Sequence, residues 1–445
     1  MSFPFGPNTL TLSDLAKQLR TTFQTFMDKR RGKNTRYMIE DAALSAFSVF
    51  FMQSPSFLEY QRTMQETHGK NNTQTLFGVH QIPTDNHIRD LLDAVEAPAV
   101  YPMFSYIFQG LLQAGVLDSY RAVGNMLLLA LDGTRYFSSQ KIHCACCSIQ
   151  HHANGQVTYF HTALTPVLVK PTLDKVIPLA PEFIQLQDGT EKQDCELNAA
   201  KRWLAQWGAT HAPLGVTVLG DDLYCHEPFC RDLLAQGMAF ILVCKPNSHS
   251  TLYDWVGFLE RSGAVKTVVK KRWTGKRYEI DTYRYALAVP LRDGEGVLRV
   301  NWGELTTTTS DGKVLYQNAF ATSHPLDDRA VLEVVQAGRS RWKIENEHNN
   351  TLKTKGYHFE HNYGHGKKHL SALLATLILL AYLVHTVLEW MDNKYRLLRQ
   401  KLPSRQRLFN DIRALTCYLY FDSWEDLLDF MLQSFDRPPP KPTTG

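Results

Sequence analysis

Three acidic residues stand where a folded chain could bring carboxylates together. Asp132 follows the apolar run 127–131, and Asp221 follows a second apolar run at 216–220. Both runs are typical of buried strands, and α/β sheets place their chemistry at the ends of such strands. Glu345 lies in a predicted helix. Three carboxylates converging from two strands and a helix could hold two hard cations, an arrangement suited to phosphodiester cleavage.

Neighbouring acidic residues are the alternatives at two of these positions. Glu345 lies four residues after Arg341 and shares its helix face, whereas Glu347 lies nearly opposite, so Glu345 is preferred. Asp222 directly follows Asp221, and adjacent strand residues face opposite ways, so only one of them can reach a shared site. Spacing alone leaves convergence open, because 44 acidic residues offer many such triples, and capping or turn roles are the alternative for each of them.

Three short motifs around these carboxylates resemble the signatures of the bacterial insertion-sequence DDE transposases. They are Leu-Asp-Gly-Thr at 131–134, Gly-Asp-Asp-Leu-Tyr at 220–224 and Arg-Trp-Lys-Ile-Glu at 341–345. They occur in the family's order, and the resemblance spans about residues 120–390. The family's Asp-x-x-Tyr pattern aligns with Asp221 and Tyr224, which favours Asp221 over Asp222.

The resemblance implies a ribonuclease H-like fold in which Asp132, Asp221 and Glu345 bind two Mg²⁺ ions, with Mn²⁺ expected to substitute. The implied activity is DNA transposition: hydrolysis of phosphodiesters at transposon ends, then transfer of the 3′ hydroxyl into target DNA. Its partners would be double-stranded DNA and a second copy of the chain in a synaptic dimer. The alternatives are a stand-alone nuclease of the same fold and a transposase-derived DNA-binding protein without catalysis.

A subgroup signature, Y-x2-R-x3-E-x6-K, is matched only in part. Arg341 and Glu345 fit, but Gly338 occupies the Tyr position, and Lys353 lies one residue too far, with Leu352 in the expected place. On an ideal α-helix the extra residue turns Lys353 by about 100°. A mechanism peculiar to that subgroup, including a DNA-hairpin intermediate, is therefore not implied.

The surrounding patterns predict an α/β protein: a ribonuclease H-like mixed sheet flanked by helices, with a β-rich insertion and an N-terminal helical region. Strands are expected at 126–131, 142–149, 157–169, 216–219, 239–243, 278–289, 297–305 and 314–321, and helices at 193–208 and 227–236. A capped amphipathic segment at 83–92 resembles half of a helix-turn-helix.

Five regions are expected along the chain. They are a helical DNA-binding region (1–120), the first part of the catalytic core (121–263), a β-strand insertion (264–326), the second part of the core with the Glu345 helix (327–393), and a C-terminal helical segment (394–445). The last of these ends in a Pro-rich tail at 437–445, which we expect to be disordered.

Basic residues in two stretches are candidates for contacts with DNA phosphates. They are Lys29, Arg30, Arg31 and Lys33 in the first stretch and Lys353, Lys355, Lys367 and Lys368 in the second, and Arg341 joins them beside Glu345. The second stretch also carries Tyr357, Phe359 and Tyr363, whose rings could stack on splayed bases. For both stretches the alternative is a solvated loop. A third basic segment, 394–407, is expected to be an ordinary exposed helix surface.

Composition permits a nucleic-acid partner without requiring one. The 445-residue chain has a formal net charge of only +4, and its 44% hydrophobic content is typical of a globular protein. Eight cysteines do not suggest a disulfide scaffold, and the start carries no apolar signal segment, so we expect a reducing, intracellular location. The family resemblance implies the bacterial cytoplasm, in association with the nucleoid. Residues 370–388 carry no formal charge, and we expect a central core helix there rather than a membrane span.

Two thiol-rich groups are weaker metal candidates. Cys144, Cys146 and Cys147 are predicted to alternate along a strand rather than to form a Cys-x2-Cys pair. The group Cys225, His226 and Cys230 has no partner at zinc-finger distance. We expect both groups to be core or surface thiols. Gly-rich phosphate loops and Gly-x-Ser-x-Gly motifs are absent, so nucleotide hydrolysis and Ser-His-Asp chemistry are not indicated.

Overall fold

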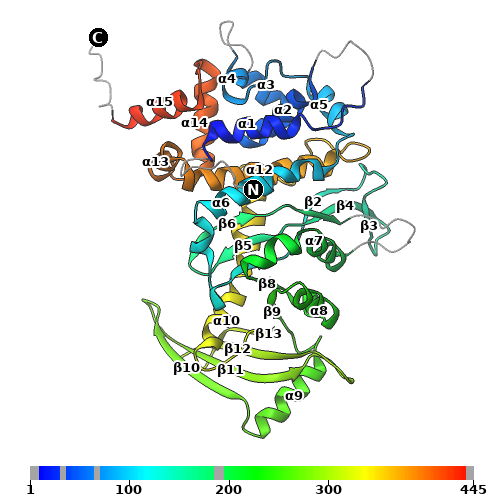
Figure 1. Ribbon diagram of the computed structural model, residues 1–445, viewed down its shortest axis with the longest axis vertical. Coiled ribbons are helices and arrows are strands. Elements are labelled where there is room, and N and C mark those ends of the chain that lie inside the picture. Colours follow the sequence, from blue (N-terminus) through cyan, green and yellow to red (C-terminus); the bar gives the residue numbers. More distant parts are fainter. Residues whose placement is uncertain (1–9, 31–36, 65–70, 185–194, 437–445) are drawn as a thin grey trace. The chain divides into compact units, whose positions relative to one another are not determined.

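The computed structural model describes residues 10–30, 37–64, 71–184 and 195–436 (Figure 1). The chain divides into two compact units. The helical unit comprises residues 1–115, 135–162 and 350–445. The sheet unit comprises residues 116–134 and 163–349. Each unit is therefore assembled from segments that are far apart in the sequence. Arg31, Lys33 and the tail expected to be disordered lie outside the described residues.

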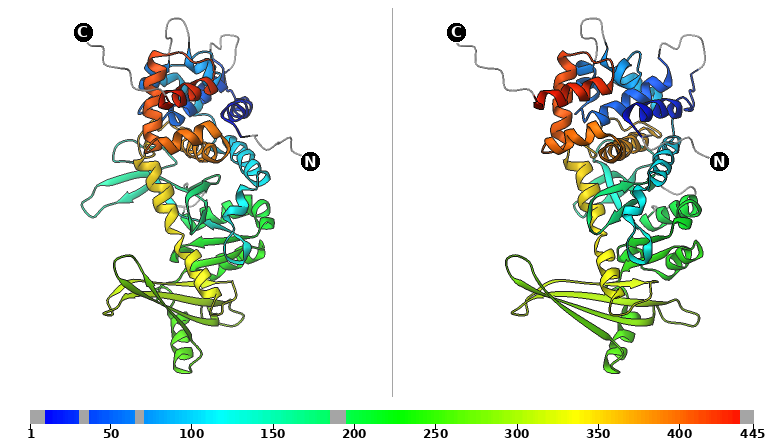
Figure 2. Two further views of the ribbon diagram at one scale, coloured as in Figure 1. Left: turned by 90° about the vertical axis from the view of Figure 1, so that its left-hand side faces the viewer. Right: turned by 60° about the vertical axis from the view of Figure 1, so that its left-hand side comes forward.

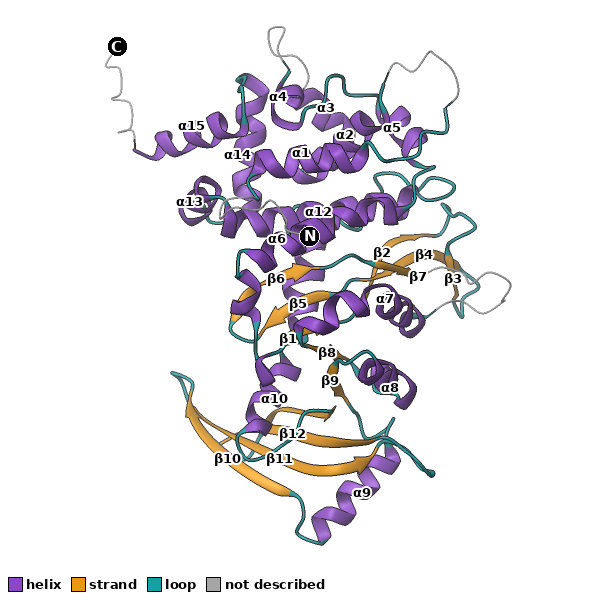
Figure 3. Cartoon of the chain, viewed as in Figure 1, coloured by secondary structure: helices purple, strands orange, loops and turns teal. Residues whose placement is uncertain are grey.

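The sheet unit is built on one nine-stranded mixed sheet with the order β10-β11-β12-β13-β9-β8-β1-β5-β6 (Figure 3). Its strands are β1 (Leu127–Ala130), β5 (Val167–Lys170), β6 (Leu173–Pro178), β8 (Val216–Gly220), β9 (Ala239–Val243), β10 (Lys266–Trp273), β11 (Tyr278–Pro290), β12 (Arg299–Thr309) and β13 (Val314–Thr322). β1, β8 and β9 run parallel, whereas β5, β6 and β10 to β13 pair antiparallel. The expected α/β core with a mixed sheet is confirmed.

Helices flank this sheet. The sheet unit contains η2 (Val116–Tyr120), η3 (Val123–Asn125), the short strand β7 (Glu182–Ile184), α7 (Glu196–His211), η4 (Ala212–Leu214), η5 (Asp222–Tyr224), α8 (Glu227–Ala235), α9 (Ser250–Arg261), α10 (Ala330–Arg339) and η6 (Ile344–Asn349). α8 packs on β9, α9 on β11, and α10 on β9 and β12. η6 is a π-helix that packs against β5 and β6. Mid-helix π segments often occur at functional sites, and this one contains Glu345.

The helical unit gathers the remaining helices with one small sheet (Figure 2). Its helices are α1 (Leu12–Phe23), α2 (Ile39–Phe51), α3 (Phe57–Met64), α4 (Asn72–Phe77), α5 (Asp85–Leu92), η1 (Ala97–Val100), α6 (Tyr101–Gln113), α11 (Asn350–Thr354), α12 (Leu370–Met391), α13 (Asn393–Lys401), α14 (Arg405–Tyr418) and α15 (Trp424–Asp436). The small sheet has the order β2-β4-β3, with β2 (Gly133–Ser139), β3 (Ser148–His151) and β4 (Val157–Leu164). α5 confirms the predicted capped helix, with the Thr84 hydroxyl accepting from the His87 N–H.

The apolar helix α12 lies at the centre of the helical unit, where it packs against α2, α6 and α13. Among the described residues it is the one helix long and apolar enough to cross a membrane, with a mean hydropathy of 2.1, but 89% of that apolar window is buried by the protein. Burial by neighbouring helices accounts for its all-round apolar surface. The interpretation as a core helix is therefore favoured over a membrane span.

Asp93 holds the segment that enters α12. Its carboxylate accepts hydrogen bonds from the backbone N–H groups of Lys367, Lys368 and Leu370 at 3.0–3.2 Å. Burial raises the pKa of Asp93, but these donors outweigh it and the net pKa is lowered. Gly366 adopts a left-handed conformation (φ +68°), and a Cβ there would collide with the Asp93 carboxylate, so only glycine fits this turn.

Two predicted strands differ from the structure. Most of the expected strand at 142–149 is an irregular connection with a turn at residues 145–146, and only Ser148–His151 forms β3. The expected strand at 157–169 is two strands, β4 and β5, which belong to different sheets and are separated by Thr165 and Pro166. Proline lacks the N–H that a continuous ladder needs, so the chain leaves one sheet there. The other predicted strands and helices are present, with ends shifted by a few residues.

Candidate active site

Asp132 lies immediately beyond β1, whose four residues are all buried. Its backbone carbonyl accepts a hydrogen bond from the Thr165 N–H at 3.0 Å. Its Oδ2 accepts one from the Asn349 side-chain amide at 3.2 Å, and its Oδ1 lies 4.0 Å from Nη1 of Arg341. These hydrogen bonds and the buried strand β1 hold the Asp132 carboxylate in place. Its side chain is 19% exposed, so it remains accessible from solvent.

Asp221 and Asp222, at the end of β8, face different surroundings. Asp221 Oδ1 accepts from the Leu223 N–H at 2.9 Å and caps η5. Asp222 Oδ1 instead accepts from the Lys245 N–H at 2.6 Å and lies 3.3 Å from His249 Nε2. Asp221, and not Asp222, is among the groups that act electrostatically on Asp132. The structure therefore brings Asp221 into the neighbourhood of Asp132 and engages Asp222 elsewhere.

Glu345 lies in the π-helix η6, four residues after Arg341. Arg341 Nη2 donates to Glu345 Oε1 at 2.8 Å, as expected for residues on one helix face. The Glu345 side chain is 51% exposed, and Glu345, rather than Glu347, acts on Asp132. Arg341 thus lies between the two carboxylates, with its guanidinium engaged by acidic groups of its own unit.

A fourth carboxylate, Glu196, was missed by the sequence analysis. It begins α7, and its Oε1 accepts from the Tyr224 hydroxyl at 2.5 Å and from the Gly133 N–H at 2.8 Å. Of the charged groups around Asp132, Glu196 acts on it most strongly. The only sequence signals were an acidic residue at a helix start and the tyrosine of the second motif, which needed a buried partner for its hydroxyl.

The glycines of two motifs make this packing possible. A Cβ on Gly133 would collide with the Glu196 carboxylate, and a Cβ on Gly220 would lie 2.8 Å from Cδ2 of Tyr224. Neither neighbour is free to move, because Glu196 and Tyr224 are hydrogen-bonded to each other. The motifs at 131–134 and 220–224 are therefore joined physically through Glu196.

The electrostatics of the site fit a bound cation. Burial raises the pKa of Asp132 to about 7, with further contributions from Glu196, Glu345 and Asp221, and the Arg341 guanidinium opposes them. Burial also raises the pKa of Glu196, although Tyr224 and Gly133 donate to it. Four carboxylates against one guanidinium leave negative charge uncompensated, and carboxylate oxygens are the donors that Mg²⁺ prefers.

Because the pKa of Asp132 is raised on folding, its ionisation should weaken the folded protein. Without divalent cations, this penalty grows as pH rises from about 4 to about 7 and is complete above that range. We expect Asp132→Asn to stabilise the protein by about 1–3 kcal/mol at pH 8 and to leave it unchanged at pH 4. Thermal denaturation in EDTA at both pH values measures this difference.

Adding Mg²⁺ at pH 8 should raise the melting temperature of the wild type and leave that of Asp132→Asn unaffected. Equal stability of the two proteins at pH 8 would mean that the Asp132 carboxylate is not desolvated as described. Asp222→Asn is the matched control, since that carboxylate has its own hydrogen-bond donor in Lys245.

The predicted DNA-binding residues are described in part. Lys29, Lys355, Lys367 and Lys368 are exposed. Arg30 is paired with Asp28 at 2.6 Å, and Lys353 with Glu360 at 2.8 Å. Basic side chains free to meet phosphates are thus found in the stretch around 353–368, whereas Arg30 and Lys353 already have acidic partners.

The rings expected to stack on bases are not available for that role. Tyr357, Phe359 and Tyr363 are all buried. The Tyr357 hydroxyl is 2.7 Å from His385 Nδ1, and the Tyr363 hydroxyl donates to the Ser54 carbonyl at 3.0 Å. The prediction was wrong, because aromatic residues in a basic stretch can equally anchor that stretch to the core.

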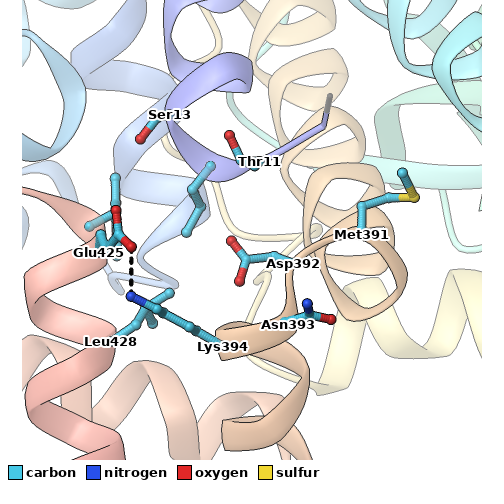
Figure 4. A pocket seen from close by; sticks show the side chains of 10 residues that line it. Thr11, Ser13, Met391, Asp392, Asn393, Lys394, Glu425 and Leu428 are labelled. Carbon is cyan, nitrogen blue, oxygen red and sulfur yellow. Dashed lines mark hydrogen bonds and ion pairs between the residues drawn. The ribbon is translucent and has the colours of Figure 1, made fainter. Parts of the chain in front are cut away.

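The third basic segment, 394–407, is largely neutralised within its own unit. Lys394 pairs with Glu425 and Asp429 at 2.7 Å. Lys394 and Glu425 also border an open pocket of about 350 Å³ that includes residues of α1, α13 and α15 (Figure 4). Arg399 and Arg405 pair with Glu389. Arg396, Lys401 and Arg407 are exposed, as expected of an ordinary helix surface, whereas Lys394, Arg399 and Arg405 are only partly exposed and are held in ion pairs.

Comparisons with known proteins give little beyond this geometry. No protein-family model matches the chain, and no curated protein is significantly similar to it in sequence. Among solved structures, the chain is similar to the cryo-EM structure of the piggyBac transposase synaptic complex with hairpin DNA. The match has 9% sequence identity and a TM-score of 0.37, and it covers 97% of this chain and 80% of that chain. A TM-score this low establishes neither a shared fold nor a shared function.

Proposed function

We propose that this chain is a DDE-type DNA transposase, which cleaves phosphodiesters at transposon ends and transfers the freed 3′ hydroxyl into target DNA. The observation that carries the proposal is the group of carboxylates around Asp132. Asp132 and Asp221 follow the neighbouring parallel strands β1 and β8, and Glu345 and Glu196 act on Asp132 from two helical segments. Acidic groups gathered at the ends of parallel strands suit metal-assisted phosphoryl transfer.

The proposed core is ribonuclease H-like. Supporting this is the strand order β6-β5-β1-β8-β9, in which three antiparallel strands are followed by two parallel ones. Such an order, with helices on the sheet, is what a ribonuclease H-like core requires. The strands β10 to β13 extend the same sheet as the proposed insertion, and they precede the helix that leads to Glu345.

Asp132, Asp221 and Glu345 are the residues proposed to hold two Mg²⁺ ions, or Mn²⁺ in their place. When bound, such a pair activates the attacking oxygen and stabilises the leaving oxygen. The Asn349 amide orients Asp132, and Arg341 holds Glu345 until a cation competes for its carboxylate. Glu196 fixes the Gly133 backbone and the Tyr224 hydroxyl beside these groups.

We propose that Lys29, Lys355, Lys367 and Lys368 contact DNA phosphates, since their side chains are exposed. Lys353 stays a candidate. A π-helix has one more residue in each hydrogen-bonded turn than an α-helix. The π-helix η6 therefore accommodates the one residue by which the Glu345-to-Lys353 spacing exceeds the subgroup signature. A homodimer bringing two transposon ends together in the bacterial cytoplasm completes the proposal.

Strand transfer tests the proposal against its nearest alternative. The full chain would be incubated with Mg²⁺ and a precut duplex that carries the terminal sequence flanking the gene, together with a supercoiled target plasmid. A transposase joins the 3′ hydroxyl to the plasmid. Cleavage of the uncut end without joining would identify a nuclease, and binding without either reaction would identify a DNA-binding protein. Either result would overturn the transposase assignment.

Glu196 should behave as a positioning residue. We expect Glu196→Gln to lower Mg²⁺-dependent cleavage about 10²-fold while DNA binding is retained, because the amide loses the charge that accepts from both the Tyr224 hydroxyl and the Gly133 N–H. The Mg²⁺ concentration for half-maximal cleavage should rise as well. Glu347→Gln is the control on the opposite side of η6, and equal activity of both variants with the wild type would contradict this role.

A further inference from the structure

Four side chains of the helical unit converge on one point outside the carboxylate site. Cys144 and Cys147 lie in the turn between β2 and β3, His161 lies on β4, and His365 lies in the segment that leads to α12. Their ligand atoms all lie within 4.8 Å of one another, and three of the four residues are buried. Among the residues that the structure describes, this is the one group of such side chains so closely gathered.

The distances between these atoms are those of a tetrahedral metal site. Around one Zn²⁺, with Zn–S near 2.3 Å and Zn–N near 2.0–2.1 Å, tetrahedral geometry separates two sulfurs by about 3.8 Å, sulfur and nitrogen by about 3.6 Å and two nitrogens by about 3.3 Å. The two Sγ atoms lie 3.9 Å apart, and the two Nε2 atoms 3.1 Å. The sulfur–nitrogen distances are 3.7 Å for Cys144–His161 and 3.4 Å for both Cys147–His161 and Cys147–His365.

The surroundings orient the same atoms for coordination. His365 Nδ1 lies 3.0 Å from the Gly366 carbonyl, and a proton on Nδ1 leaves the Nε2 lone pair facing the cluster. The Cys144 backbone N–H donates to Cys147 Sγ at 3.4 Å, a contact that favours a thiolate at Cys147. The Phe137 ring packs against both imidazoles and gives this side of the group an apolar wall.

We propose that Cys144, Cys147, His161 and His365 form a structural Zn²⁺ site. Two thiolates and two imidazoles in a tetrahedron select Zn²⁺ among common divalent ions, and four protein ligands leave no open position for catalysis. The ion would tie the turn after β2 to a segment more than 200 residues later, 204 residues separating His161 from His365. The sequence analysis placed these cysteines on a strand and missed the Cys-x2-Cys spacing of Cys144 and Cys147, which lie in the connection between β2 and β3.

Metal analysis of the purified full chain tests this site independently of any activity on DNA. After exposure to a mixture of Zn²⁺, Fe²⁺, Ni²⁺ and Mg²⁺ followed by dialysis, the wild type should retain about one Zn²⁺ per chain. Cys147→Ser and His365→Asn should lose it. Cys146→Ser, which alters the cysteine between the two ligands, and Asp132→Ala, which alters the carboxylate site, should keep it.

A second measurement on the wild type covers the case in which a ligand variant fails to fold. Co²⁺ in place of Zn²⁺ should give thiolate-to-metal charge transfer and the intense visible bands of a tetrahedral site, which carboxylate ligands alone would not produce. Removing Zn²⁺ with a mercurial reagent and a chelator should lower the melting temperature by several degrees. A metal-free wild type without the charge-transfer band, a Cys144–Cys147 disulfide, or full Zn²⁺ retention by Cys147→Ser would each overturn the proposal.

Discussion

Asp132→Asn should reduce Mg²⁺-dependent cleavage of transposon-end DNA by about 10³-fold or more while leaving DNA binding within about twofold of the wild type. The substitution keeps the shape of the side chain and its contact with Asn349, but it removes the charge that a divalent cation would need. Asp221→Asn and Glu345→Gln should have effects of similar size. Single-turnover cleavage and gel-shift binding, measured on the same preparations, separate the two properties.

Asp222→Asn is the matched control for this series, because it changes the carboxylate next to Asp221 in the sequence and leaves the group around Asp132 intact. Its carboxylate accepts from the Lys245 N–H and faces His249, so cleavage should continue. Asp132→Cys adds a direct test of metal ligation. A thiolate is a poor ligand for Mg²⁺ and a better one for softer ions, so Mn²⁺ should restore part of the activity of this variant. Normal cleavage by Asp132→Asn, or no rescue together with lost binding, would contradict the metal-ligand role.

Glu389→Ala should lower the free energy of unfolding of the helical unit by about 3 kcal/mol. Glu389 Oε1 lies 2.7 Å from Arg405 Nη2 and 3.3 Å from Arg399 Nε, and the Glu389 and Arg405 side chains are only 11% and 15% exposed. Removing the carboxylate leaves the guanidinium groups of Arg399 and Arg405 without this acidic partner in a poorly hydrated environment. The Tyr357 hydroxyl, which accepts from Arg405 Nη1 at 2.8 Å, cannot replace the lost charge.

Urea denaturation followed by far-ultraviolet circular dichroism measures this effect, with Glu425→Ala as control. Glu425 pairs with Lys394 at 2.7 Å, but its side chain is 71% exposed and Lys394 also contacts Asp429, so its removal should cost less than about 1 kcal/mol. Similar losses in the two variants would show that the Glu389 pair is no better shielded than a surface pair.

Local sequence patterns were sufficient for most elements and for the positions of three carboxylates. The buried strands β1, β8 and β9 were recognisable as short apolar runs, and Asp132 and Asp221 as the acidic residues that follow two of them. The strand predicted at 142–149 failed because apolar and thiol residues also suit an irregular connection, here the one that brings Cys144 and Cys147 close to His161 and His365. The strand at 157–169 failed at Pro166, where an apolar stretch continues but its hydrogen-bond ladder cannot.

Partners distant in the sequence could not be identified from spacing. Glu196 contacts Gly133 at a sequence separation of 63 residues, and no pattern in either segment indicates the other. Likewise, the Cys144–Cys147 pair gained its imidazoles from β4 and from the segment before α12. The aromatic rings near Lys355 were read as exposed because their neighbours are charged, yet each fills a place in the core.

By itself, the sequence determined which residue types could do chemistry, which strands and helices would carry them, and that the sheet would be mixed. Those features depend on local periodicity and on residues at the ends of elements, which act over a few positions. Only the tertiary structure decided that Asp221 rather than Asp222 lies near Asp132, that Glu196 joins them, and that two noncontiguous sets of segments form separate compact units. These outcomes depend on long-range packing, because a buried polar group needs a hydrogen-bond partner and that partner can come from any part of the chain.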